Sequence, residues 1–257
     1  MFGRVAREAW LQAKMSFRTP LFFAAEVLSS AMWLVVLMLA ILWYGEPAAE
    51  PAGHLFWGLV VFTIFSSQTW TAATINDYVR NGVLDYIAAT PEKLHLYLMA
   101  SSTASAALAT PSVLAQVAVF YFLFSRLPPL EQPHFFAAAL ALFIASSSAV
   151  VSATASLFMR LRNPSVAANV VQLVVPASGG MIPPTLMPQD VARAFTYSPF
   201  QYVVAPVIYS ATGQWLLDPL FTLTVGTLIA AGLVALSAVT TRQVLKTVKS
   251  TGKWGLE

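Results

Sequence analysis

Residues 134–159 decide the fold class: they run HFFAAALALFIASSSAVVSATASLFM and contain no Asp, Glu, Lys or Arg. A helix needs about 20 mostly apolar residues to cross a bilayer core of roughly 30 Å, so this run is long enough to span it. The rest of the chain has the same character, since 58% of its 257 residues are hydrophobic and only 10% are charged. Soluble domains carry roughly 25% charged residues. The sequence therefore predicts an all-α protein that crosses the membrane several times.

Further runs without charges, or nearly so, lie on both sides of this one, and not all of them can be assumed to span. The weakest is 194–217, because Pro199, Pro206 and Gly213 interrupt it. We therefore expect the region 188–213 to be re-entrant, on the outer face, where protein or water must cover its backbone. The predicted transmembrane helices are then six, at 20–44, 54–76, 94–125, 134–159, 164–183 and 218–241.

The basic residues predict the orientation, since Lys and Arg are enriched in cytoplasmic flanks. With both ends of the chain inside, all of the 14 Lys and Arg except Arg126 and Arg193 lie on the cytoplasmic side. We therefore expect a multi-pass protein of the plasma membrane with cytoplasmic termini.

Each end of the chain has a basic face. Residues 1–18 predict an amphipathic helix on the inner membrane surface, and 242–257 a cytoplasmic basic tail. These faces either attract anionic lipid and set the orientation, or dock a cytoplasmic partner. Their residues are Arg4, Arg7, Lys14 and Arg18 at the first end, and Arg242, Lys246, Lys249 and Lys253 at the second.

The loop between the second and third spans, 76–91, runs NDYVRNGVLDYIAATP. Gly82 permits a break after the second span. A short helix over 82–89 can follow, with Thr90 as the N-cap and Pro91 as the first residue of the next helix. The pattern predicts a short cytoplasmic helix across the mouth of two spans.

This short helix is expected to expose Leu84 and Ile87 beside Asp85. An ordinary cytoplasmic turn is the alternative interpretation, but such a turn has no need of exposed apolar side chains there.

At this loop the chain resembles the membrane subunit of type-2 ATP-binding-cassette (ABC) exporters. That family has an acidic–Gly–x–Leu–acidic stretch ending in Thr-Pro, although Asp85 stands where Glu is commoner and Val83 where Thr is usual. The matching residues here are Asp77, Gly82, Leu84, Asp85, Thr90 and Pro91.

A second match follows the fifth span. The family has a Ser-Gly turn, a Pro and a Leu-x-Pro there, before two short re-entrant helices. This chain has SGGMIPP at 178–184, Leu186-Met187-Pro188, and later Ser198-Pro199. The six-span plan and the N-terminal helix also match, so the resemblance covers nearly the whole chain.

The resemblance implies that 82–89 is a coupling helix that docks a cytoplasmic ATPase, present in two copies. It also implies a second permease subunit, in a homodimer or a related heterodimer. The chain has no Gly-x-x-x-x-Gly-Lys-Ser/Thr phosphate loop, so ATP and Mg are expected on the partner ATPase, and this chain is predicted to have no catalytic site and no cofactor. The predicted coupling residues are Asp77, Arg80, Gly82, Leu84, Asp85, Ile87, Thr90 and Pro91.

Polar residues inside spans are often functional. In the family, spans two and five face each other across the dimer axis, which implies a translocation path lined by Phe65, Gln68, Thr69, Asn169 and Gln172. The alternative is that such side chains bond across packed helices.

Two further groups of residues are interpreted structurally. Ser148, Ser152 and Ser156 repeat every four residues and predict close helix packing. Glu26 lies near the inner end of the first span, where an ion pair at the cytoplasmic gate, with Arg160 as the chosen partner, is favoured over a role as a proton carrier.

The predicted function is therefore the permease subunit of an ATP-driven exporter of a hydrophobic or amphipathic substrate, such as a drug-like compound, natural product or lipid. A lipid-linked glycan is the alternative substrate, and an ion-coupled secondary transporter is the alternative mechanism. An ion-coupled transporter needs acids near mid-membrane, whereas only Glu26 is available. A membrane enzyme is disfavoured because the three histidines are widely separated, and no nucleic-acid partner is expected.

Overall fold

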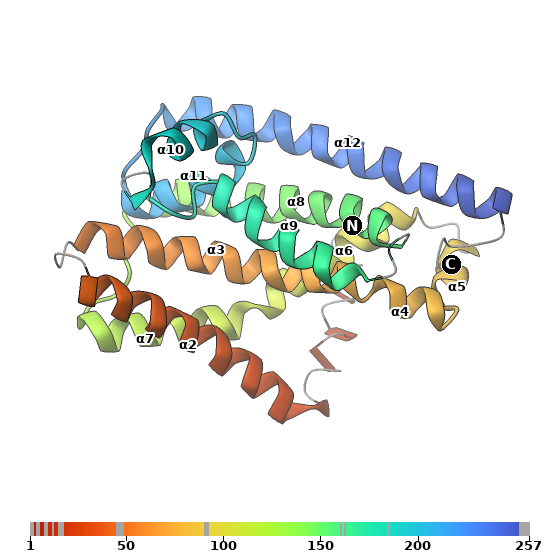
Figure 1. The fold of residues 1–257 in the computed structure, drawn as a ribbon, viewed down its shortest axis with the longest axis horizontal. Coiled ribbons are helices and arrows are strands. Elements are labelled where there is room, and N and C mark those ends of the chain that lie inside the picture. Colours follow the sequence, from red (N-terminus) through yellow and green to blue (C-terminus); the bar gives the residue numbers. More distant parts are fainter. Residues whose placement is uncertain are drawn as a thin grey trace.

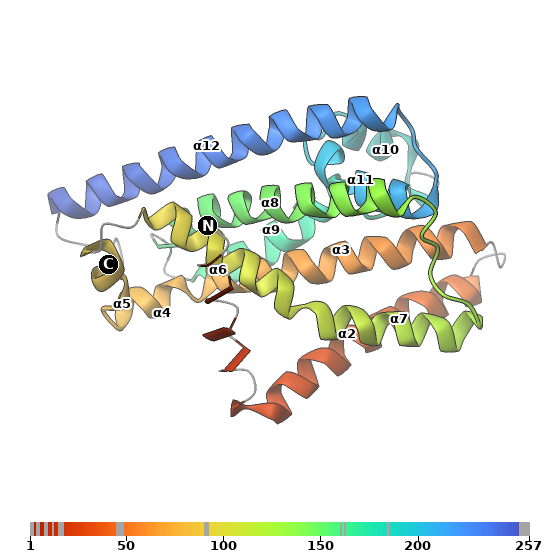
Figure 2. The same ribbon diagram turned by 180° about the vertical axis from the view of Figure 1, so that it is seen from behind.

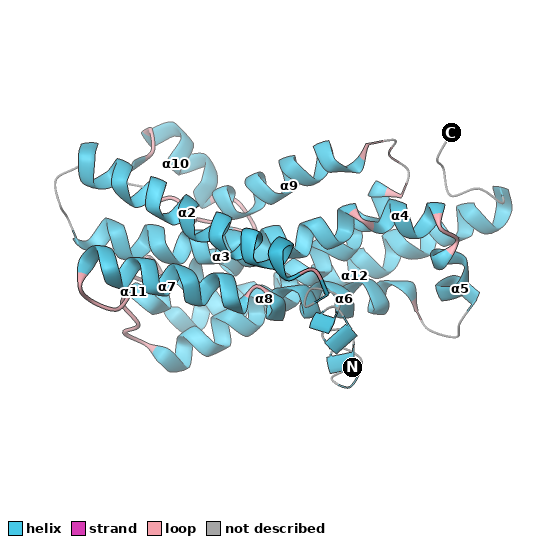
Figure 3. Cartoon of the chain, turned by 90° about the horizontal axis from the view of Figure 1, so that it is seen from below, coloured by secondary structure: helices cyan, strands magenta, loops and turns pink. Residues whose placement is uncertain are grey.

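The structure is a computed structural model of the chain. It describes residues 3, 6–7, 10–11, 13–14, 18–44, 49–89, 93–159, 161, 163–183 and 186–251. Every regular element in these ranges is a helix (Figure 3), which confirms the predicted all-α class. Most of the amphipathic helix predicted over 1–18 lies outside the described residues.

The chain runs back and forth along the long axis of an elongated bundle (Figure 1). The helices that run along this axis are α2 (Pro20–Tyr44), α3 (Ala49–Ala73), α6 (Leu94–Leu108), α7 (Thr110–Phe124), α8 (Pro133–Phe158), α9 (Pro164–Ser178) and α12 (Pro219–Thr251). At one end, α3 is followed by α4 (Ile75–Arg80) and α5 (Val83–Ala89). The opposite end holds α10 (Gln189–Thr196) and α11 (Gln201–Thr212).

In the described part of the chain, three helical stretches are long and apolar enough to cross a membrane: Leu94–Phe124, Pro133–Phe158 and Pro219–Val248. Shorter apolar helices cover Phe23–Val36 and Pro164–Ser178. These stretches indicate a membrane protein. The last helix, α12, continues beyond the span predicted at 218–241, so the first part of the predicted basic tail is helical.

Helix α8 lies at the centre of the bundle and packs against α12, α11, α6 and α3. Its small residues allow this close approach, and Ser148, Ser152 and Ser156 are fully buried. On α12, the Ser237 hydroxyl donates to Ser152 Oγ at 2.7 Å, and Thr241 Oγ1 lies 2.9 Å from Ser156 Oγ. These contacts confirm the prediction that the serines mediate helix packing.

The long apolar run predicted as one helix over 94–125 is broken at Ala109 (Figure 2). Pro111 has no N–H to donate to the carbonyl of Ala107, four residues earlier, and its ring disturbs the helix there. The Ala107 carbonyl still accepts a backbone N–H at the end of α6, and it also accepts a hydrogen bond from the Thr110 hydroxyl at 2.6 Å. Backbone and side-chain donors of the same turn thus satisfy this oxygen although Pro111 has no N–H, which allows the break within an apolar segment.

The fifth predicted span, 164–183, ends earlier than expected, because α9 stops at Ser178 and turns at Gly179. The turn packs tightly against α11, since a Cβ at Gly179 would lie 2.6 Å from Val204 Cβ. Helix α11 is buried along most of its length. The backbone N–H groups of Glu131 and Gln132 donate to the carbonyls of Ala211 and Ser210, respectively. These bonds join the last turn of α11 to the loop before α8.

Candidate functional site

The first candidate site is the elbow, which we define as α4, the turn at 81–82 and α5. Helix α3 is interrupted at Thr74, whose hydroxyl donates to the Thr71 carbonyl at 2.9 Å. Gly82 then reverses the chain with a φ of +68°, a left-handed conformation that glycine adopts without strain. No atom lies within 4 Å of a Cβ built on Gly82, so the requirement for glycine is conformational and not steric. The elbow is therefore built by two local breaks close together in the chain.

The packing of α5 differs from the sequence expectation at Leu84. The sequence predicts an exposed apolar knob at this position, but Leu84 is fully buried and belongs to the same apolar cluster as Ile75. The Gly82 turn folds α5 back on the bundle, so the helix buries its leucine. Among the side chains of α5 that the structure describes, Val83, Asp85 and Tyr86 are exposed, and Tyr86 is 80% exposed.

The other predicted coupling residues are placed only in part. Asp77 is exposed on α4. The side chains of Arg80 and Ile87, and the whole of Thr90 and Pro91, lie outside what the structure describes. The polar surface of the elbow, as far as the structure describes it, includes Asp77, Asn81, Asp85 and Tyr86. Sequence reasoning did not select Tyr86, and an aromatic residue on a short exposed helix is the signal that could have found it.

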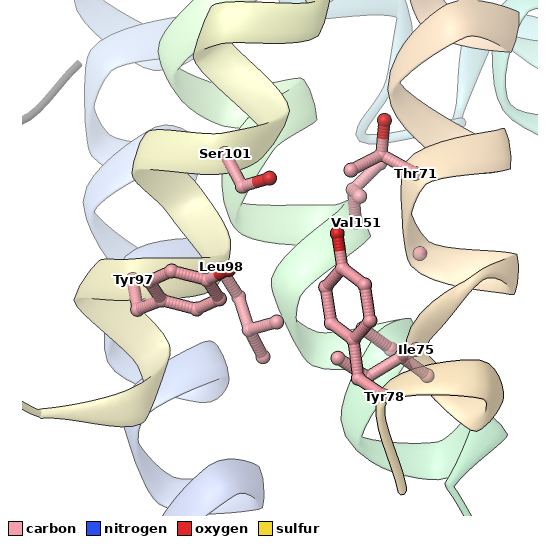
Figure 4. Close-up of a pocket in the computed structure, with 9 residues that line it drawn as sticks. Thr71, Ile75, Tyr78, Tyr97, Leu98, Ser101 and Val151 are labelled. Atoms are coloured by element: carbon pink, nitrogen blue, oxygen red, sulfur yellow. The ribbon is translucent and has the colours of Figure 1, made fainter. Parts of the chain in front are cut away.

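A water-sized cavity of about 10 Å³ lies beside the elbow, between α6 on one side and α3 and α4 on the other (Figure 4). Thr71, Tyr78, Tyr97 and Ser101 bring hydroxyl groups to its walls, and Val151 of α8 closes its back. A cavity needs roughly 10–15 Å³ to hold one water molecule. A cavity large enough for about one water molecule, lined partly by hydroxyl groups, therefore lies next to the junction of α3 with α4.

The predicted path residues on α3 lie inside the subunit. Phe65, Gln68 and Thr69 have no exposed surface. Gln68 Nε2 donates to Ser148 Oγ on α8 at 3.1 Å, and the Thr69 hydroxyl donates to the Phe65 carbonyl at 2.9 Å. These three residues therefore line no surface of the single chain, and their role in a path stays a prediction. The geometry instead matches the alternative, in which polar side chains bond across or along packed helices.

The predicted path residues on α9 are on the surface. Asn169 is exposed and Gln172 half-buried, and Gln172 Nε2 donates to Asn169 Oδ1 at 2.9 Å. Ser66 of α3 donates to Gln172 Oε1 at 3.0 Å. These three residues form a polar seam between α3 and α9, and Trp70 is partly exposed on α3 one turn further along. The sequence indicated the α9 members through their helical spacing but did not select Ser66.

The predicted gate ion pair cannot be placed. Glu26 is exposed on α2, and Arg160 lies outside the described residues. Among the described residues, no three metal-ligating side chains lie together.

No protein-family model matches this chain, and no curated protein matches it in sequence.

Proposed function

We propose that the chain is the membrane-spanning permease subunit of an ATP-driven exporter of the type-2 ABC kind, coupled to a separate ATPase. The elbow is the observation that carries this proposal. Leu84 ties α5 to the bundle, while Val83, Asp85 and Tyr86 face outward. A helix anchored by a buried side chain can transmit the push of a docked ATPase through α4 to α3. This arrangement supports a coupling role better than an exposed Leu84 would, because the anchor and the docking surface are separate.

In the proposed topology, the six spans are α2, α3, α6 with α7, α8, α9 and α12. Both termini and the elbow lie in the cytoplasm, and α10 and α11 are re-entrant at the outer face of the plasma membrane. The distribution of charge supports this orientation. Lys93 precedes α6, and Arg242 and Lys246 belong to the last part of α12, and these helix ends lie on the side of the elbow (Figure 1). Arg126 follows α7 and Arg193 belongs to α10, at the opposite end.

The polar seam is the proposed wall of the translocation path. Ser66, Asn169 and Gln172 face outward beside apolar Val166, Val170 and Leu173 of α9. A second permease subunit placed against this face would enclose a mixed polar and apolar channel. Such a lining suits a hydrophobic or amphipathic substrate. ATP and Mg would be bound by the two partner ATPases.

Coupling is tested by co-purifying the full chain with its ATPase and measuring ATP hydrolysis after reconstitution. The double variant Asp85→Arg with Tyr86→Ala changes only exposed groups and should lose the ATPase while keeping its thermal stability. Tyr197→Ala is the matched control, because Tyr197 is 87% exposed and directly follows α10, which lies at the opposite end of the bundle. If no ATPase accompanies the wild-type chain, or if the double variant retains it fully, the proposal fails and an ion-coupled transporter becomes the better candidate.

Topology is tested with single cysteines, for which the chain is suited because it contains none. A cysteine at Tyr86 should react with an impermeant maleimide only in inside-out vesicles, and one at Leu216 only in right-side-out cells. Labelling of both positions from one side would exclude the proposed arrangement.

A further inference from the structure

A second, larger cavity lies at the end of the bundle opposite the elbow. Its volume is about 220 Å³. Helix α11 contributes Tyr202 and Tyr209 to its wall, the loop before α12 contributes Leu216 and Leu217, and Thr222 closes it from α12. Thr196 of α10 also lines the cavity, so four segments of the chain form its wall. These elements lie at the end of the bundle opposite α4 and α5 (Figure 1).

The chemistry of this cavity is mixed but uncharged. Its lining combines leucine and tyrosine side chains with threonine hydroxyls and the Gln201 amide, and the described residues that form it include no Asp, Glu, Lys or Arg. Burying an unpaired charge in such surroundings is strongly unfavourable. Pockets for small molecules are mostly apolar, with a few placed polar groups that fix orientation. The lining therefore favours a neutral ligand.

One polar group in the wall is buried and has a hydrogen to donate. Tyr209 is only 5% exposed, and its hydroxyl oxygen accepts a hydrogen bond from Gln201 Nε2 at 2.8 Å. Because that contact uses the oxygen as an acceptor, the hydroxyl proton remains available. Within the described residues, no protein acceptor receives it. A ligand with a carbonyl or ether oxygen would satisfy it.

The Gln201 amide is held in place by its surroundings. It packs against Gly180, where a Cβ would lie 3.0 Å from Gln201 Oε1, and Gly180 adopts a φ of +94° that favours glycine. The Gly180 carbonyl lies 3.0 Å from His54 Nε2, and the His54 ring meets the Tyr209 ring edge-on with centroids 6.2 Å apart. Gln201, Gly180, His54 and Tyr209 thus form a closed ring of contacts that holds the Gln201 amide beside the Tyr209 hydroxyl.

The loop that forms the outer wall is also anchored. Trp215 Nε1 donates to Gln132 Oε1 at 2.7 Å, which ties the loop to the residue before α8. The adjacent Leu216 is 62% exposed and Leu217 is 50% exposed, so these two side chains form the rim of the cavity. A fixed wall with an apolar rim provides an entrance for an apolar molecule.

We propose that this cavity binds a small neutral amphiphile that carries a hydrogen-bond acceptor, such as a ketone, ester or amide, with Tyr209 as the donor. The site goes beyond the proposed ATP-driven transport and does not depend on it. Its failure is distinguishable from failure of that proposal, because ligand binding is measured on the purified chain without an ATPase.

Benzophenone is the probe for this site, since it is a neutral aromatic ketone that forms covalent bonds to nearby C–H groups on irradiation. The full chain in detergent is titrated with the probe and irradiated, and the labelled peptides are identified by mass spectrometry. Saturable labelling is expected in the peptides around Tyr202 and Leu216. In Tyr209→Phe the half-saturating concentration should rise about fivefold, the effect of losing one hydrogen bond of roughly 1 kcal/mol.

Tyr197→Phe is the matched control, because it removes the same hydroxyl from an exposed tyrosine that does not line the cavity. It should label like the wild type. Leu217→Trp, at the exposed rim, should reduce labelling by obstructing the entrance, and this variant keeps the test valid if Tyr209→Phe is unstable. Unsaturable labelling spread over the apolar helices, or equal titrations for Tyr209→Phe and Tyr197→Phe, would overturn the proposal.

Discussion

Gln68 Nε2 of α3 donates to Ser148 Oγ of α8 at 3.1 Å in the fully buried centre of the bundle. Ser148 Oγ is also 3.0 Å from Thr103 Oγ1 of α6, and Thr103 donates to the Met99 carbonyl. The Ser148 hydroxyl therefore donates to Thr103 and accepts from Gln68. One hydroxyl group joins three helices.

Ser148→Ala should destabilise the protein because it leaves the buried Gln68 amide without its acceptor. We expect a loss of about 1 kcal/mol, between the roughly 0.6 kcal/mol typical of inter-helix bonds in membranes and the larger penalty of an orphaned group. The measurement is the unfolding free energy in mixed detergent micelles. The double variant with Gln68→Leu should recover much of the loss, since both partners are then apolar.

Ser102→Ala is the control for this pair. Ser102 is equally buried on α6, but its hydroxyl has no hydrogen-bond partner in the described part of the chain. Its removal should leave stability unchanged or slightly raised. A loss as large as that of Ser148→Ala would show that burial alone, and not the bond, determines the effect.

Leu84→Ala should destabilise the protein by about 2–4 kcal/mol, because it empties a fully buried position. Val83→Ala, on the exposed side of the same helix, should change stability by less than about 0.5 kcal/mol. Thermal unfolding of the purified chain measures both. Equal effects would mean that α5 is not anchored through Leu84.

The outcome at Leu84 shows what the sequence could and could not predict. Gly82 and the surrounding pattern indicated a short helix, and α5 begins at Val83. A helix this short has few residues on each face, so its sequence does not tell which side meets the bundle. That choice depends on the left-handed turn at Gly82 and on the packing of α4, which are tertiary features.

The buried polar residues illustrate a second limit. The spacing of Ser148, Ser152 and Ser156 indicated a packing face because small residues repeat once per turn. The polar residues Gln68 and Thr69 gave no comparable signal, since an amide inside an apolar helix is compatible with a path or with a helix contact. Only the position of α8 beside α3 distinguishes these two roles.

Ala155→Leu should destabilise the protein by about 1–3 kcal/mol, because the cavity beside the elbow is too small for the added carbons. Ala155 lines that cavity and is 1% exposed. Ala155→Ser adds only one oxygen beside several hydroxyl groups and should be tolerated. Ala145→Leu, at an exposed position of α8, is the control for helix α8 itself. Thermal unfolding distinguishes these cases, and an Ala155→Leu variant as stable as the control would show that the junction adapts freely.

Two glycines of α12 should respond in opposite ways to alanine. A Cβ at Gly226 would collide with the Tyr202 carbonyl and lie 2.8 Å from Leu142 Cδ2, whereas no atom lies within 4 Å of one at Gly232. The collision has a specific origin: Pro206 has no N–H to bond the Tyr202 carbonyl, so that oxygen faces α12.

Gly226→Ala should therefore destabilise the protein by about 1–3 kcal/mol, by separating α12 from α11. Gly232→Ala should leave stability unchanged or raise it by up to about 1 kcal/mol, because alanine has the higher helix propensity. Unfolding free energies of the two variants measure the contrast, and similar values would show that α11 and α12 do not approach each other at Gly226.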